Sequence, residues 1–147
     1  MVSSGEVKAQ GAKISEQLES YKGKITEMGS NWEGDSYKSL KEKAEAFVAE
    51  AQSIQSSIDS FASACDQYQD YLKYKENYDK CCKRIKSLED EIERIKEHND
   101  NLKEGEEKKS YSNEYRNLKK MKNTRDACKK SYETCASQIK SLLDSIS

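Results

Sequence analysis

The chain has 147 residues, of which 36% are charged and 34% apolar, with no proline and a formal net charge of −1. This is one domain's worth of sequence, and the low apolar content excludes a large globular core. A net charge near zero provides no basic field for nucleic acid or acidic lipid. No stretch approaches the roughly 20 apolar residues that span a bilayer, so we expect no integral membrane segment.

Residues 1–13 are polar and lack an apolar core, so we expect no Sec-type signal peptide. The cysteines number five, which leaves at least one thiol free or paired with another chain. Without a secretory leader, we expect reduced cysteines that fill apolar contacts between helices.

Apolar side chains in residues 7–28 recur at alternating steps of three and four, which predicts a helix. Ser3 and Glu6 have capping-box spacing, so this helix should begin near Ser4. Residues 37–58 carry a second stripe of the same period, and the two stripes match in reverse order around the segment 29–35. They predict an antiparallel helix-turn-helix hairpin over residues 1–65.

In the register that this mirror sets, Tyr21 faces Ala44 and Gly11 faces Ile54. The pattern recurs in residues 71–102 and 111–146, separated by a turn over 103–110. It predicts a second antiparallel coiled-coil hairpin over 66–147, in which Cys128 faces Ile85. The expected fold is therefore all-α, with two antiparallel hairpins that share one long central helix in an elongated coiled-coil rod.

Two positions on the second pair of stripes are polar, namely Asn99 and Arg125. Polar residues at such positions cost stability and fix the register of a coiled coil.

The central helix also carries a face of small residues in the first hairpin. Small side chains permit close approach of another helix, so this face could complete a four-helix bundle in a dimer; the alternative is an ordinary solvated surface. The proposed protein–protein interface consists of Ala46, Ala49, Ser53, Ser56, Ser60 and Ala62.

The turn between the first two predicted helices contains Trp32, Glu33 and Gly34. A Trp-Xaa-Gly turn at the centre of an antiparallel helical hairpin resembles the WXG family, the early secreted antigenic target-like proteins, over about residues 4–65. The resemblance implies a cytoplasmic protein that a type VII secretion ATPase exports as a homodimer or a heterodimer. It assigns Trp32 and Gly34 to a turn that forms part of the export signal.

The other part of that signal is a Tyr-Xaa-Xaa-Xaa-Asp/Glu motif after the second helix, and none of the nine tyrosines has Asp or Glu four positions later. This departure favours a subunit that depends on the signal of a partner, such as another WXG-like protein or an LXG-type toxin for which it serves as targeting factor or chaperone. The alternative is a cytoplasmic coiled-coil adaptor or structural protein with no role in secretion.

No constellation of residues supports catalysis, so we expect a binding protein rather than an enzyme, with no cofactor. His98 lies on the polar side of the central helix, and a hairpin offers no cleft for a catalytic triad. Four cysteines fall within about one turn of each other but lack Cys-Xaa-Xaa-Cys spacing, so we expect neither zinc nor a disulfide: Cys81, Cys82, Cys128 and Cys135. Four tyrosines at helical spacing indicate contacts between helices rather than a stacking platform for nucleic acid: Tyr68, Tyr71, Tyr74 and Tyr78.

Overall fold

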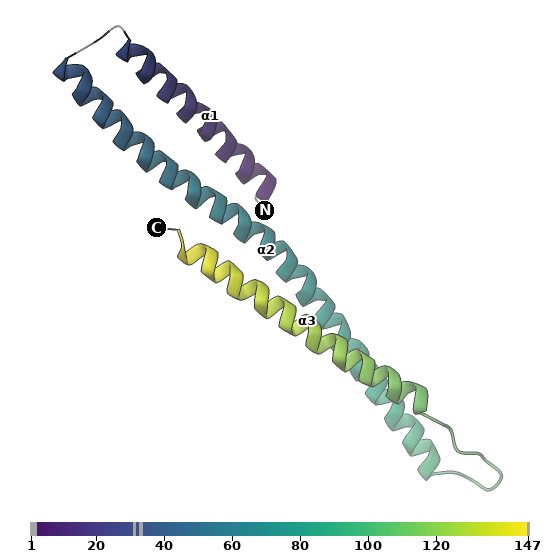
Figure 1. The fold of residues 1–147 in the computed structure, drawn as a ribbon. Coiled ribbons are helices and arrows are strands. Elements are labelled where there is room, and N and C mark those ends of the chain that lie inside the picture. Colours follow the sequence, from purple (N-terminus) through teal and green to yellow (C-terminus); the bar gives the residue numbers. More distant parts are fainter. Residues whose placement is uncertain (1–2, 31, 33, 147) are drawn as a thin grey trace. The chain divides into compact units, whose positions relative to one another are not determined.

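The computed structural model describes residues 3–30, 32 and 34–146, and these residues form three helices (Figure 1). Helix α1 runs over Ser4–Gly29, α2 over Asp35–Asp100 and α3 over Ser112–Asp144. Within the described part of the chain there is no β-strand, so the expected all-α fold class is confirmed. No helix among these residues is long and apolar enough to cross a membrane.

Local side-chain chemistry sets the ends of the helices. Ser3 caps α1 by accepting a hydrogen bond on its side-chain oxygen from the backbone N–H of Glu6, at 3.2 Å, and this confirms the predicted start at Ser4. At the other end, the backbone N–H of Ser30 donates to the carbonyl of Glu27, at 3.1 Å. The cap groups therefore satisfy backbone donors and acceptors that the helix itself leaves free.

Close contacts divide the chain into two units. The first unit comprises residues 1–67 and 138–147, and the second comprises residues 68–137. Helix α2 contributes its residues 35–67 to the first unit and 68–100 to the second.

In the first unit, contacts between α1 and α2 follow an antiparallel order. The Tyr37 hydroxyl donates to the carbonyl of Ile25 at 3.2 Å, near the turn. Farther along α2, the Gln55 side-chain amide donates to the carbonyl of Gly11 at 3.2 Å. A Cβ at Gly11 would lie 3.3 Å from Cγ2 of Ile58, so the absence of a side chain there lets the helices approach closely.

This arrangement differs from the predicted register in which Gly11 faces Ile54. It also exposes two residues that the prediction placed between the helices: Phe47 is 55% exposed and Ile54 is 59% exposed. The next residue along α2 faces α1 in place of each: Val48, after Phe47, is buried, and Gln55, after Ile54, is half-buried. Apolar residues on α2 form two neighbouring stripes, and α1 covers the one with the smaller side chains, which allows a closer approach of the helix axes.

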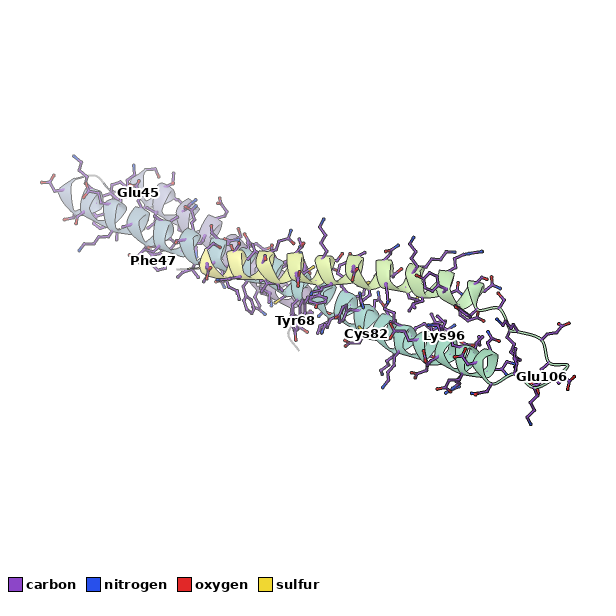
Figure 2. All side chains as sticks on the ribbon, turned by 90° about the horizontal axis from the view of Figure 1, so that it is seen from below. Glu45, Phe47, Tyr68, Cys82, Lys96 and Glu106 are labelled. Atoms are coloured by element: carbon purple, nitrogen blue, oxygen red, sulfur yellow. The ribbon has the colours of Figure 1, made fainter. Side chains whose placement is uncertain are left out.

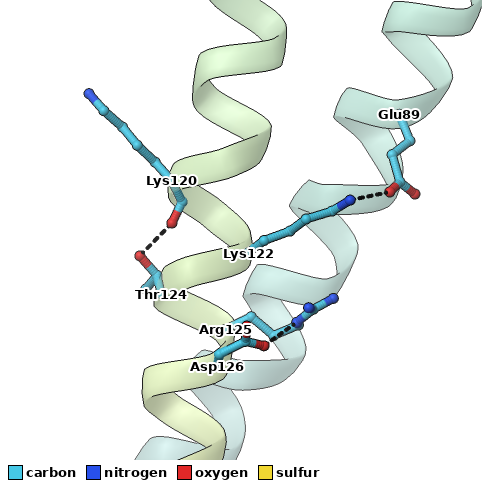
Figure 3. A network of polar contacts seen from close by, with 6 residues as sticks. All are labelled: Glu89, Lys120, Lys122, Thr124, Arg125 and Asp126. Carbon is cyan, nitrogen blue, oxygen red and sulfur yellow. Dashed lines mark hydrogen bonds and ion pairs between the residues drawn. The ribbon is translucent and has the colours of Figure 1, made fainter.

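The core of the second unit is a cluster of aliphatic side chains between α2 and α3, with Tyr111 and Met121 packed against it: Ile85, Leu88, Ile92 and Leu118. Lys122 on α3 forms an ion pair with Glu89 on α2 at 3.3 Å (Figure 3). The Cys128 thiol lies within hydrogen-bonding reach of the Cys81 thiol, one helical turn before Ile85, the residue predicted to face it.

The connection between α2 and α3 is held by Asn99. Its side-chain oxygen accepts from the backbone N–H of Lys109 at 2.8 Å, and its amide nitrogen donates to the carbonyl of the same residue at 2.9 Å. These two hydrogen bonds join the end of α2 to the loop, and the expected role of Asn99 in fixing the register of the two helices stays a prediction. Arg125, the other polar position, instead pairs with the adjacent Asp126 at 3.0 Å (Figure 3).

Candidate interaction surface

The turn that follows α1 presents Trp32 at the surface. Trp32 is 40% exposed, and its ring centroid lies 6.0 Å from that of Tyr37. Tyr37 is fixed by its hydrogen bond to Ile25 and by Gly29, where a Cβ would collide with the tyrosine hydroxyl. Trp32 also borders a hollow of about 480 Å³ that is lined by Lys24, Glu27 and Met28. The aromatic ring is thus supported by the hairpin and still accessible.

Gly34 has a φ of +115°, in the region that residues with a Cβ rarely adopt. Nothing lies within 4 Å of a Cβ built there, so the backbone conformation, and not space, requires glycine. The Gly34 carbonyl accepts from the backbone N–H of Lys38 at 3.1 Å, which joins the turn to the first turn of α2. Glu33, the middle residue of the Trp-Xaa-Gly motif, lies outside the described residues, as does Asn31.

The small residues of the predicted interface differ in how exposed they are. Four are exposed on α2, namely Ala46, Ala49, Ser53 and Ser56. Ser60 is half-buried, and its hydroxyl accepts from that of Ser145 at 3.4 Å, so residues 138–147 already reach this end of the face.

Ala62 is a correction to the predicted interface, because it is completely buried inside the first unit. It lies fourteen residues after Val48, close to four full turns of helix, and therefore on the buried side of α2. The spacing of small residues alone could not separate this buried alanine from the exposed ones.

A stripe of large apolar side chains lies on the surface of α2 and was not predicted from the sequence. Phe47, Ile54 and Phe61 are 55%, 59% and 44% exposed, and we call them the Phe–Ile–Phe stripe (Figure 2 labels Phe47). They are spaced seven residues apart, almost two helical turns, so they lie along one side of the helix. The seven-residue spacing was the available signal for this surface.

The ring of Tyr21 on α1 approaches Phe47 edge-on, with centroids 5.5 Å apart. The first unit also has a groove of about 580 Å³ between α1 and α2, with apolar walls that include Ile25, Ala44 and Val48. Lys22 and Lys41 also line this groove. A groove lined by both apolar and charged side chains can bind a ligand or another protein.

Four of the five cysteines lie in the second unit. Burial raises the pKa of the Cys81 thiol, and its neighbours Cys128 and Cys82 raise that pKa further. All five cysteines are free, and the described residues contain no group of three or more side chains suited to a metal ion. A protonated, buried thiol is a poor nucleophile, so Cys81 acts as a small apolar residue between the helices.

Tyrosines in the second unit form an aromatic cluster between α2 and α3. Tyr132 contacts Tyr71 and Tyr78 edge-on, with centroids 5.8 and 5.4 Å apart. The Lys75 ammonium lies 4.8 Å from the centre of the Tyr78 ring and 5.0 Å from that of Tyr132. These contacts agree with the predicted place of Tyr71 and Tyr78 between helices.

The other two tyrosines of that series are more exposed, and the ring of Tyr68 stacks on that of Tyr71 with centroids 6.2 Å apart. Tyr68 is 43% exposed and Tyr74 is 37% exposed.

No family model, no curated protein and no solved structure matches this chain.

Proposed function

We propose that this chain is a non-catalytic helical protein of a bacterial type VII secretion system. It would be either a WXG-like secreted substrate or a targeting and chaperone subunit that binds an LXG-type toxin. The observation that carries the proposal is the Trp32–Gly34 turn. It places an accessible tryptophan and a glycine with positive φ between two helices that contact each other in antiparallel order.

Two further observations support binding over catalysis. The described residues of the first unit expose several large apolar side chains, and exposed apolar patches mark sites of protein interaction. Cys81 and His98 do not form a common site. Cys81 is buried and has a raised pKa, and His98 is half-buried near the end of α2. The proposed partners, which the family resemblance implies, are a WXG-like or LXG-type protein and the type VII secretion ATPase, with no nucleic acid.

A cytoplasmic coiled-coil adaptor is the second candidate function. It is favoured by the missing Tyr-Xaa-Xaa-Xaa-Asp/Glu motif and by the 66-residue length of α2. The two candidates make opposite predictions about export.

The test is an export assay in a Gram-positive host with an active type VII system, with the neighbouring genes of the native locus co-expressed. We expect the protein in the culture medium, and we expect Trp32→Ala and Gly34→Ala to abolish export while the cellular level of the protein is maintained. Tyr115→Ala is the matched control, because Tyr115 is 62% exposed on α3 and lies far along the chain from the turn. Export that is indifferent to Trp32 and Gly34, or no export at all, would favour the adaptor.

A further inference from the structure

Three cysteines of the second unit gather at one level of the contact between α2 and α3. Cys81 on α2 is buried, and its neighbour Cys82 and Cys128 on α3 are half-buried. The Cys128 thiol lies within hydrogen-bonding reach of the Cys81 thiol, whereas the Cys82 thiol shares a hydrogen bond with the Tyr78 hydroxyl on its own helix. Cys81 and Cys128 are therefore the two thiols that face each other across the helices.

The other two cysteines lie apart from this pair. Cys135 follows Cys128 by seven residues, which is about 10 Å along α3. Cys65 belongs to the first unit. No disulfide was expected from the spacing of the cysteines along the chain, because that spacing does not show which thiols face each other across two helices.

The distance between packed helices allows a covalent bond at this contact. Helix axes pack about 8–10 Å apart, and Cα atoms lie about 2.3 Å from their own axis. Cα atoms that face each other directly are therefore roughly 3.5–5.5 Å apart, and farther when they are offset. A disulfide joins Cα atoms about 4.4–6.8 Å apart, so two facing cysteines on packed helices fall within its reach.

A bond at this place would close the second hairpin at the end opposite its loop. The chain between Cys81 and Cys128 includes the connection from α2 to α3 and all four residues of the buried aliphatic cluster. At the other end, Asn99 already joins α2 to the loop through its two hydrogen bonds to Lys109. A disulfide that closes the loop over residues 82–127 also removes conformational freedom from the unfolded chain, so it would stabilise this hairpin.

We propose that Cys81 and Cys128 form a redox switch: two thiols under reducing conditions, and a disulfide that links α2 to α3 once the protein meets a low-molecular-weight disulfide. The inference goes beyond the proposed function, and its chemistry does not depend on export. An exported protein passes from a reducing to an oxidising environment, so export is one event that would close the switch. That use alone rests on the proposed function.

The reaction is thiol–disulfide exchange in two steps. The Cys128 thiolate attacks one sulfur of the small disulfide, which forms a mixed disulfide on Cys128 and releases one small thiol. The Cys81 thiolate then attacks the sulfur of Cys128, and the second small thiol leaves. The two cysteines are oxidised, the small disulfide is reduced to two thiols, and the two protons from the cysteines end on those thiols.

Access decides which cysteine reacts first. Cys128 is half-buried, whereas burial raises the pKa of the Cys81 thiol and lowers the share of its thiolate. The first attack therefore falls to Cys128. The second step takes place within one molecule, between sulfurs that already lie close together, and this proximity offsets the low share of Cys81 thiolate.

The first experiment oxidises the purified full-length chain with an excess of oxidised glutathione at about pH 8, where thiolates are available. Free thiols are then blocked, and the disulfides are mapped by mass spectrometry of unreduced peptides. We expect one predominant link within the chain, between Cys81 and Cys128, which a reductant removes. Cys128→Ser should abolish this link. The matched control is Cys82→Ser, which changes the other half-buried thiol of the cluster and should leave the link intact.

The second experiment compares urea unfolding of the reduced and the oxidised chain by circular dichroism. We expect the midpoint of the oxidised chain to be at least about 1 M higher, because the closed loop restricts the unfolded state. In Cys128→Ser the two samples should have the same midpoint. A shift that persists in this variant would overturn the proposal, since the link could not be its cause.

Other products of the oxidation would also overturn it: a main link between Cys82 and Cys128, a mixed disulfide that remains on Cys128, or links only between different chains. A link between Cys81 and Cys128 that lowers the midpoint would overturn it too, because the bond would then distort the hairpin. A chain that forms the link but is never exported would refute the proposed function alone. An exported chain that forms no such link would refute this inference alone.

Discussion

Leu88 should contribute more to stability than any other single side chain in the second unit. It is only 1% exposed and lies in the cluster with Ile85, Ile92 and Leu118. Truncation of a buried leucine to alanine costs about 2–5 kcal/mol, from lost apolar burial and from the cavity that remains. Because two helices can close partly around a cavity, we expect about 3 kcal/mol for Leu88→Ala.

The assay is urea-induced unfolding followed by circular dichroism at 222 nm, with the free energy of unfolding extrapolated to water. Leu72→Ala is the matched control, because Leu72 lies on the same helix and in the same unit but is 37% exposed. We expect it to cost about 1 kcal/mol, since less apolar area is lost and no enclosed cavity forms. Equal costs for the two variants would refute the assignment of the core to the cluster around Leu88.

Three further predictions address single residues. Asn99→Ala removes both hydrogen bonds to the loop and should lower the free energy of unfolding by about 1–2 kcal/mol in the same urea titration. Gly34→Ala should destabilise the protein by about 1 kcal/mol because of the positive φ at Gly34. Gly23→Ala, at an open position inside α1, should stabilise it by about 0.5–1 kcal/mol. Thermal melts in which both substitutions change the stability in the same direction would contradict this. Because burial raises the pKa of Cys81, alkylation by iodoacetamide at pH 8 should be slower at Cys81 than at the half-buried Cys82, and the rate at Cys81 should keep rising above pH 9; peptide mapping that finds equal rates would refute it.

The sequence predicted the helical fold class and the start of the first helix, because both depend on local signals. Apolar residues at steps of three and four indicate a helix wherever it lies, and the Ser3 cap acts over only three residues.

The register between helices could not be predicted in the same way. A slip of about one helical turn keeps apolar side chains opposite apolar side chains, so the pattern barely distinguishes Ile54 from Ile58 as the neighbour of Gly11. Backbone contacts decide between such registers, for example the Gln55 amide on the Gly11 carbonyl.

The exposed stripe was missed for a related reason. Large apolar residues are usually buried, so Phe47 and Ile54 were placed between the helices. The next residue on α2 takes each position instead, because Val48 is buried and Gln55 is half-buried. Helix α1 could cover either of two neighbouring stripes on α2. The choice between them depends on the sizes of their side chains and on how closely the two helices approach at Gly11.

The central proposal is that this chain is a partner-binding protein of a type VII secretion system. The most direct measurement is the fraction of the protein in the culture medium of its native host, compared between a strain with the type VII secretion ATPase and a strain that lacks it. The account predicts a substantial extracellular fraction that falls to the level of a cytoplasmic marker when the ATPase is deleted. Equal fractions in the two strains, with the neighbouring genes expressed, would contradict it.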